Sequence, residues 1–505
     1  MPALILTAAS MMRWLVSMGA TGAKRYSRLV KQFWNYVYNA SYQLLVIAAA
    51  LVTTPYLARS LGPGALGVYG YVVSVASILQ TLALLSLYTY GSRQVAYSRD
   101  SAAEVNRVFW ELMTIRCLLG VIVSAVYWGV ALFTPYTQLF LLYYPWILAN
   151  ILDVTWFFIG FEDMKVVVLK NVAVKIACVL SIFAFVRSEN GLVKYLMIMS
   201  VFTFLGNVSV YPQLRRYVGK PDLNPGFTSR HLSNAVKLFI PEVTSNLTHR
   251  INHITMGHVL ATADDIAFFD QGEKIINIPS SLVTAMNSVV MPRMANDHVR
   301  LKDSSVEEYA MAVGSAELMV AIPLAVGVAS VAGRLVPWFF GPGFERAIPV
   351  IQLMSPLIVI DSLIGIVGAQ YLTATDKTTV LNRSNGLGLC VNIVLNILLV
   401  PIAGCIGAVL STVFARLVIL AYQVFVTLNG LSYNRIARSA LRYASASLVM
   451  MAAVMLVGQS VENDIVCTVV QVLVGCVVYP ALLIACGDPI LRALYGMLVQ
   501  EKAVS

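Results

Sequence analysis

The chain has 505 residues, of which 58% are hydrophobic and only 12% are charged. Soluble globular domains carry about 25% charged residues, so this composition excludes an ordinary soluble protein and predicts a polytopic α-helical membrane protein. The formal net charge of +10 raises nucleic acid as a partner. Basic residues gathered in short loops on one side of a membrane explain this charge better, and we expect no nucleic-acid binding.

The first 35 residues are predicted to form a cytoplasmic or interfacial leader. Arg13 interrupts their apolar stretch, and the basic sequence KRYSRLVKQ follows it. A cleavable signal peptide carries its charges before the apolar part, so it is the weaker alternative.

Apolar stretches of membrane-spanning length follow one another from Tyr36 to Cys486. They predict about fourteen transmembrane helices, at residues 36–58, 68–90, 108–130, 138–160, 166–186, 193–214, 237–260, 267–292, 309–332, 347–372, 378–400, 404–428, 441–460 and 465–486. Between the first two, LVTTPYLARSLGPGALGVYGY is rich in glycine and proline. We expect Pro55 to end the first span and the glycines to form a tight turn at the outer face.

The distribution of basic residues sets the expected topology. With the N-terminus inside, 25 of the 35 lysines and arginines lie at the inner face, 5 at the outer face and 5 within spans. Because positive charge marks the cytoplasmic side, both termini are predicted to be cytoplasmic.

The longest connection divides the chain after the sixth span, and it is basic and rich in turn-forming residues. It suggests an all-α architecture of two six-helix halves with two further helices at the C-terminus. The expected parts are the leader 1–35, a first half 36–214, a linker 215–236, a second half 237–428, and the last two helices with a tail, 429–505.

Ionisable residues inside the predicted spans are the first candidates for a functional site. Each buried cation costs roughly 2.5 to 3.5 kcal/mol at the centre of a membrane helix. Structural ion pairs are one interpretation, such as Lys274 with Asp270 at i,i+4 spacing; the other is a water-filled cavity, which we favour for the set. The cations are Arg116, Lys175, Arg250, Lys274 and Arg416, and the acids include Asp153, Glu317 and Asp361.

The seventh span carries the clearest polar stripe. Asn246, His249, Arg250 and His253 fall on one helical face, a pattern that neither a lipid-facing nor a core helix needs. The two histidines at i,i+4 spacing could hold a metal ion. No third ligand accompanies them in an HExxH context, and we predict no metal site.

Milder stripes occur on the fourth and eleventh spans. Asn150 and Asp153 share a face of the fourth, and Asn385 and Asn392 share a face of the eleventh. The amides suit either a cavity or hydrogen bonds between helices. Aromatic rings, amides and cations facing a cavity would suit a ligand that combines sugars with phosphate.

A series of motifs resembles the Wzx-type polysaccharide or O-antigen repeat-unit flippases, of the MATE-like multidrug/oligosaccharidyl-lipid/polysaccharide (MOP) transporter superfamily. In the first half these motifs are NYVYNASYQLL, TTPYLARSLGPGALGVYGY, YGSRQVAYSRD and LDVTWFFIGFEDMK. In the second half they are DQGEKIINIPSSLVTAMNSVVMPRM, QYLTATDKT and NIVLNILLVPIAGCIGAVLSTV.

The resemblance implies two six-helix lobes that rock between inward-open and outward-open states. It implies an undecaprenyl-diphosphate-linked oligosaccharide as substrate, moved from the inner to the outer leaflet of the bacterial cytoplasmic membrane. The five embedded cations would then contact substrate. Membrane lipids, a polysaccharide polymerase and a chain-length regulator are the partners to expect, with no cofactor.

Two departures from the family pattern make the interior more positive. Asn252 stands where relatives often have an acid, and Arg416 stands near the end of the twelfth span where an acid is common. Coupling to H⁺ or Na⁺ through Asp153, Glu317 or Asp361 stays open, although the membrane potential alone favours export of a diphosphate.

Three other functions compete with this interpretation. A MATE-like, cation-coupled exporter of small molecules predicts acid-dominated lobes. A polymerase or ligase of lipid-linked glycans predicts a large external loop with catalytic Arg or His, so we expect no enzyme. A flippase for the peptidoglycan precursor is mechanistically close but fits the motif series less well.

Overall fold

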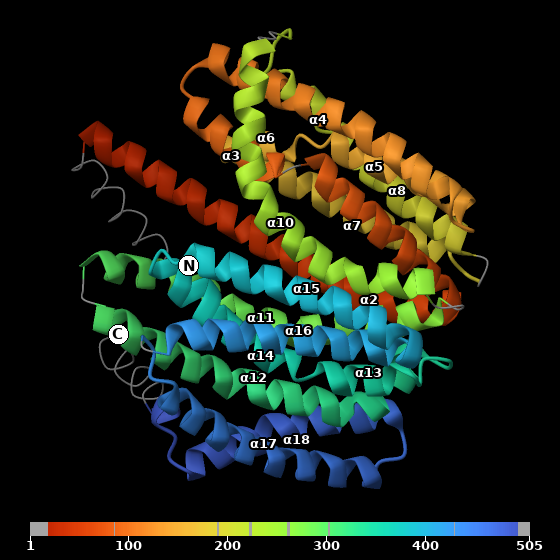
Figure 1. The fold of residues 1–505 in the computed structure, drawn as a ribbon, viewed down its shortest axis with the longest axis vertical. Helices are drawn as coiled ribbons and strands as arrows, with labels where there is room; N and C mark the ends of the chain where they lie inside the picture. The colour runs from red at the N-terminus through yellow and green to blue at the C-terminus, as the bar shows by residue number, and fades with distance from the viewer. Residues whose placement is uncertain are drawn as a thin grey trace, which may run out of the picture. The chain divides into compact units, whose positions relative to one another are not determined.

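The computed structural model describes residues 19–84, 86–188, 191–221, 225–259, 263–300, 303–428 and 430–492. The elements that these residues form are α-helices and one π-helix (Figure 1). They are α2 (Gly19–Leu84), α3 (Leu87–Ser98), α4 (Ala102–Leu132), α5 (Thr137–Ile151), α6 (Thr155–Gly160), α7 (Met164–Phe185), α8 (Leu192–Val208), α9 (Tyr211–Leu214), α10 (Pro225–Val259), α11 (Asp264–Arg300), α12 (Asp303–Phe340), α13 (Ala347–Met354), α14 (Leu357–Ile364), η2 (Gly365–Leu372), α15 (Thr378–Ala403), α16 (Cys405–Thr427), α17 (Tyr433–Ser460) and α18 (Asp464–Ala485).

The all-α membrane fold predicted from hydropathy is confirmed. Within the described ranges, 11 helical segments are long and apolar enough to cross a membrane. The first of them, Ser41–Ser98, holds both of the first two predicted spans. Helices α10 and α11 occupy the positions of the seventh and eighth, which are more polar.

The glycine-rich stretch between the first two spans differs from expectation. Pro55 does not end the helix but lies inside α2, and the helical geometry breaks at Gly62, where φ is 71°. This φ is in the left-handed region that glycine adopts without a steric penalty. Gly67 also needs to lack a side chain, because a Cβ there would lie 1.7 Å from the carbonyl oxygen of Ala263. The break is thus a kink, and the chain continues as helix on both sides.

The described chain packs into two compact units. Among the described residues, the first contains those up to Thr53, Leu79–Val186 and Val193–Phe239, and the second contains Thr54–Ile78, Arg187–Leu192 and those from Ile240 to Arg492. The division expected at 215–236, and the boundaries of the predicted halves, stay a prediction.

The first unit has an aromatic core where α3, α4 and α6 meet. Trp156 is fully buried and stacks on Phe109, with ring centroids 5.8 Å apart. Gly91 on α3 allows this approach, because a Cβ there would lie 2.6 Å from the indole ring. This core holds α6, which forms the last part of the fourth predicted span, in place.

A chain of buried polar contacts ties the start of α10 to α3 and α4. His231 on α10 is 2% exposed, with Nδ1 2.7 Å from the hydroxyl of Tyr90 and Nε2 3.1 Å from Oε2 of Glu111. Arg107 donates from Nε to Oε1 of the same carboxylate at 3.0 Å. Since an ionised carboxylate only accepts hydrogen bonds, Nε2 of His231 donates to Glu111.

We expect His231→Ala to destabilise the first unit strongly. Removing one hydrogen-bond partner of a buried carboxylate typically costs about 1.5 to 3 kcal/mol, because the charged oxygen stays buried. Tyr90→Phe removes a single hydrogen bond and should cost about 1 kcal/mol. Thermal unfolding of the two variants in detergent measures the difference. Equal, small shifts in their midpoints would show that the contact does not hold α10 in place.

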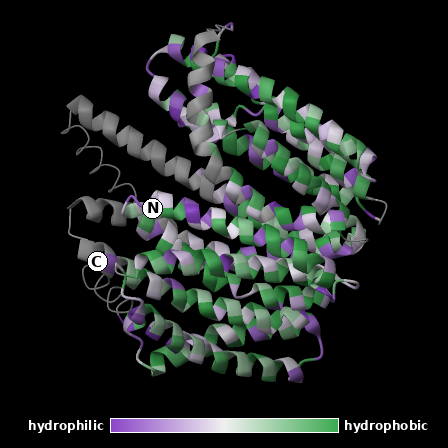
Figure 2. Cartoon of the chain, viewed as in Figure 1, coloured by the Kyte–Doolittle hydropathy of each residue, from purple (hydrophilic) through white to green (hydrophobic). Residues whose placement is uncertain are grey.

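The second unit packs α17 and α18 against α12 (Figure 1). Their buried contact includes Met450, Tyr443 and Tyr479, and the Tyr479 hydroxyl donates to the carbonyl oxygen of Met319 at 2.7 Å. Apolar side chains cover most of the length of α17 and α18, with hydrophilic residues toward the helix ends (Figure 2). Many are exposed, such as Leu473 at 59%, as expected of side chains that face lipid.

Candidate functional site

The fourth predicted span is interrupted in the middle. Helix α5 ends at Ile151 and α6 begins at Thr155, so the residues between them leave backbone groups without helical partners. Asp153 satisfies part of this break, because its Oδ1 accepts from the amide of Thr155 at 3.0 Å and from the Thr155 hydroxyl. Non-helical backbone at membrane depth is tolerated where it is buried in protein or lines a cavity, and broken helices frequently form transporter binding sites.

Arg116 on α4 meets this break from the side. Its Nη2 donates to the carbonyl oxygen of Asn150 at 2.7 Å, and the residue is 1% exposed. Within the described part of the chain, Nε and Nη1 have no hydrogen-bond partner. A buried guanidinium normally uses its donors, so these two could still bond to an acceptor such as a phosphate oxygen.

Asn150 is fixed by bonds in two directions. Its Oδ1 accepts from Nε2 of Gln80 at 2.7 Å, and its Nδ2 donates to the carbonyl oxygen of Trp146 at 2.7 Å. The side chain predicted to face a cavity therefore braces α5 against the end of α2. The backbone carbonyl of Asn150, and not its side-chain amide, contacts Arg116.

Lys170 on α7 is a second cation at the break. Its Nζ donates to Oγ1 of Thr155 at 3.0 Å and to Oδ1 of Asn207 at 2.9 Å, and lies 3.8 Å from Oδ1 of Asp153. Lys170 is not among the residues predicted from the sequence, because it resembles the basic flank of the fifth span. Its position inside the predicted range 166–186 was the available signal.

Lys170 lines two polar cavities. One, of about 270 Å³, is lined by residues that include Lys170, Lys175, Asn171, Asn207 and Thr203. The other, of about 400 Å³, is lined by Lys165, Lys170, Arg216, Gln213 and Asp163 among others. Cations outnumber acids in both linings, so the first unit offers polar space that suits an anionic ligand.

An amide cluster joins α10, α15 and α16 in the second unit. Asn396 donates from Nδ2 to Oδ1 of Asn252 at 2.7 Å and contacts Oδ1 of Asn392 at 3.2 Å. Asn252 in turn donates to Oγ1 of Thr412 at 2.9 Å. All three asparagines are buried. Asn392, a predicted cavity residue, thus takes part in hydrogen bonds that hold helices together.

Two of the predicted cations form ion pairs. Lys274 lies 2.7 Å from Asp270, which confirms the i,i+4 pair expected from the sequence. Arg416 lies 3.3 Å from Asp361, so a predicted substrate-binding cation pairs with a predicted coupling acid. These contacts supply both cations with a protein partner, in contrast to the unused donors of Arg116.

The other predicted site residues are more dispersed. Asn246 and Arg250 on α10 and Asn385 on α15 are half-buried, and their proposed contact with a ligand stays a prediction. The side chain of His249 lies outside the described residues. His253 is fully buried.

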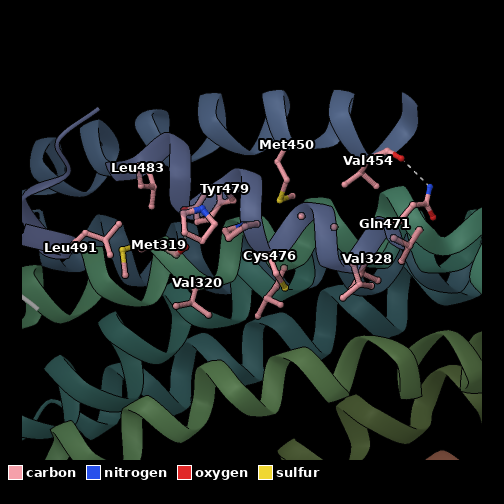
Figure 3. Close-up of a pocket in the computed structure, with 17 residues that line it drawn as sticks. Met319, Val320, Val328, Met450, Val454, Gln471, Cys476, Tyr479, Leu483 and Leu491 are labelled. Carbon is pink, nitrogen blue, oxygen red and sulfur yellow. Dashed lines mark hydrogen bonds between the residues drawn. The ribbon is translucent and has the colours of Figure 1, made fainter. Parts of the chain in front are cut away.

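An apolar cavity of about 420 Å³ opens among α12, α17 and α18 (Figure 3). Its lining includes Val328, Met450, Cys476 and Leu483. The sequence pattern does not predict this cavity. The side-chain amide of Gln471 does not leave a free donor in the cavity, because its Nε2 donates to the carbonyl oxygen of Val454 at 3.1 Å. Small residues on the facing helices, such as Gly475, leave the space free.

Solved structures show the fold. The Lipid II flippase MurJ in its inward closed conformation superposes with a TM-score of 0.71 at 14% identity, covering 91% of this chain and 100% of that chain. An inward-facing multidrug resistance MATE family transporter of the MOP superfamily gives 0.59 at 13% identity, covering 79% and 95%. The chain thus has the polytopic fold of these transporters.

Curated relatives and a family match identify the sequence. Proteins of Escherichia coli (strain K12) and Shigella dysenteriae, both named "Putative O-antigen transporter", are 23% and 24% identical to it. The first alignment covers 67% of this chain and 82% of the relative, and the second covers 69% and 89%. Residues 34–298 match the family described as polysaccharide biosynthesis protein. The chain belongs to this family of polysaccharide biosynthesis proteins.

Proposed function

We propose that this protein is a flippase for a lipid-linked oligosaccharide. Its substrate would be an undecaprenyl-diphosphate-linked repeat unit of a surface polysaccharide, moved by alternating access from the inner to the outer leaflet of the cytoplasmic membrane. The family match and the names of the curated relatives support a role in O-antigen or related polysaccharide export. The excess of basic residues on one side supports cytoplasmic termini.

The observation that carries the proposal is the buried guanidinium of Arg116 with two unused donors. Within the described residues the buried guanidinium has one hydrogen-bond acceptor, a neutral carbonyl, and an anion bound during the transport cycle would use its remaining donors. A diphosphate supplies oxygens that Arg can bind in a bidentate manner. Lys170 and the two polar cavities beside it add positive charge and space for sugar hydroxyls.

The apolar cavity among α12, α17 and α18 would hold part of the polyprenyl chain. Its lining is hydrocarbon apart from isolated polar atoms, so it suits an isoprenoid better than a sugar. The proposed substrate has a polar sugar-diphosphate part and an apolar lipid chain. The protein has polar cavities that suit the first and an apolar cavity that suits the second.

Energetics permit outward movement without a coupled ion. Two negative charges that leave an inside-negative cell gain about 2.3 kcal/mol each per 100 mV, or about 4.6 kcal/mol together. A cation-coupled exporter of organic cations would need an acidic site. At the broken fourth span, by contrast, the two cations Arg116 and Lys170 both interact electrostatically with the carboxylate of Asp153.

The test is complementation of cells that lack their own repeat-unit flippase. Wild-type protein should restore exposure of the lipid-linked glycan at the outer leaflet, read by an added glycan-cleaving enzyme. It should confer no resistance to organic cations. Resistance without glycan exposure would replace this proposal with the small-molecule exporter. The same cells, with tagged polymerase and chain-length regulator, would show whether these are partners.

If transport is coupled to protons, we propose Glu317 as the coupling residue. It is fully buried on α12 and accepts from the Ser362 hydroxyl and from Nε2 of Gln370, each at 3.0 Å. Both partners are neutral, whereas Asp361 pairs with Arg416 and Asp153 lies near Lys170. Gln370 belongs to the π-helix η2, and π-helices often occur at functional sites.

Glu317→Gln should therefore remove any dependence of glycan transport on an imposed pH gradient. The unfolding midpoint should change little, because an amide of the same shape can bond to the same two partners. Asp361→Asn is the matched control and should keep the gradient dependence. A gradient response unchanged in Glu317→Gln would remove Glu317 from the coupling mechanism.

A further inference from the structure

The proposed transport leaves unexplained a cluster where α10 meets α11 in the second unit. Asp270 and Glu273 lie one helical turn apart on α11, and His253 faces them from α10. One ligand atom from each of the three lies within 4.8 Å of the other two. Both carboxylates and the imidazole can thus approach a single point.

His253 is buried without satisfying its ring nitrogens. It is 0% exposed, and within the described residues neither Nδ1 nor Nε2 has a hydrogen-bond partner. Nε2 nevertheless lies 3.5 Å from Oδ1 of Asp270, so the ring is aimed at the cluster. Phe269 packs edge-on against the ring, with centroids 5.4 Å apart. Apart from this long contact with Asp270, the buried ring nitrogens can accept an additional ligand.

We propose that His253, Asp270 and Glu273 bind a divalent transition-metal ion such as Zn²⁺ or Co²⁺. An imidazole nitrogen with carboxylate oxygens is a donor set for these metals, whereas Na⁺, Mg²⁺ and Ca²⁺ prefer oxygen alone. Bonds of about 2.0 to 2.2 Å bring tetrahedral ligands within roughly 3.5 Å of one another, so small side-chain rotations close the site. Three protein ligands leave the fourth position for water.

Lys274 would compete with a bound metal ion for the carboxylate of Asp270. Its ammonium group lies 2.7 Å from Oδ2 of Asp270, and its side chain is 45% exposed. The ammonium and the metal are alternative counter-charges for the same carboxylate. Because nearly half of the Lys274 side chain is not packed against protein, it can move away when the metal binds. The site therefore joins α10 to α11 through a metal when Lys274 releases Asp270.

Metal binding to the purified full-length protein tests this inference directly. Co²⁺ titration, followed by visible absorption, reports coordination by nitrogen and oxygen; Zn²⁺ competition gives affinity. We expect one bound ion per chain in wild type. His253→Gln and Glu273→Gln should each weaken binding by at least about 100-fold, since even outer-shell partners are worth about 10- to 100-fold.

Lys274→Met distinguishes a metal site from a structural cluster. It should strengthen binding by on the order of tenfold or more, because it removes a cation beside the ligands. His258→Gln is the matched control, since His258 lies on the same helix but is exposed and contacts Tyr71 and the carbonyl oxygen of Ile254. It should bind as wild type does.

Unchanged affinity in His253→Gln, or unchanged or weaker affinity in Lys274→Met, would overturn the metal site. If His253→Gln fails to fold, Glu273→Gln and Lys274→Met decide the question. These measurements involve no glycan, so their outcome is independent of the proposed transport.

Discussion

Replacing Arg116 with methionine should strongly reduce glycan transport while leaving the protein as stable as wild type or more stable. The buried guanidinium makes one bond to the Asn150 carbonyl and leaves two donor groups unused. Replacing a poorly compensated buried charge with an apolar side chain of similar size is often neutral or stabilising. A hydrogen bond to a charged group contributes about 1.5 to 3 kcal/mol. Its loss should therefore lower the transport rate by about 10- to 100-fold or more.

Arg116→Lys is the matched variant, because it keeps the charge and loses the planar, bidentate donor geometry. Its transport should fall between wild type and Arg116→Met. Initial rates of glycan exposure, normalised to protein level, give the transport value, and thermal unfolding in detergent gives stability. If Arg116→Met transports normally, or if it loses transport only because it unfolds, Arg116 does not bind substrate.

Filling the apolar cavity should make transport depend on the length of the lipid chain. Gly475 lines this cavity, and a Cβ there would meet Sδ of Met450 at 3.6 Å, an ordinary contact. Alanine thus fits, whereas the longer side chain of Gly475→Leu would occupy space proposed for the isoprenoid. Displacing about three methylene groups costs about 2.4 kcal/mol, which is roughly 50-fold in affinity.

The measurement compares one oligosaccharide on a long and on a short polyprenyl diphosphate. Gly475→Leu should weaken transport of the long-chain substrate and spare the short-chain one, while Gly475→Ala should transport both as wild type does. An equal loss for both chain lengths would mean that the substitution disturbs α17 and α18 instead. No loss for either would place the lipid chain elsewhere.

Hydropathy sufficed to predict the helices, because each span must satisfy its own backbone in lipid. Hydropathy could not show at which residue the helix α2 is interrupted. Pro55 and Gly62 both disfavour a helix, and the sequence does not show that α2 tolerates the proline and kinks at the glycine. That choice depends on packing, such as the close approach of Gly67 to Ala263.

The candidate site was predictable only in part, for a related reason. Asp153 was a recognisable embedded acid, but Lys170 became part of the site through bonds to Thr155 and Asn207 on other helices. The partner of Arg116 is a backbone carbonyl, which has no signature in the sequence. Likewise, the pairing of Arg416 with Asp361 joins residues far apart in the chain, and helical periodicity relates only residues within one helix.

The central claim is that the protein itself moves a diphosphate-linked glycolipid across a bilayer. The most direct measurement reconstitutes purified wild type and Arg116→Met in vesicles that contain a polyprenyl-diphosphate oligosaccharide. The fraction of the oligosaccharide that an added glycosidase cleaves is then measured over time. We expect rapid exposure of the inner-leaflet pool with wild type, accelerated by an inside-negative potential, and little exposure with Arg116→Met. Exposure no faster than in protein-free vesicles, or equal in both proteins, would contradict the account.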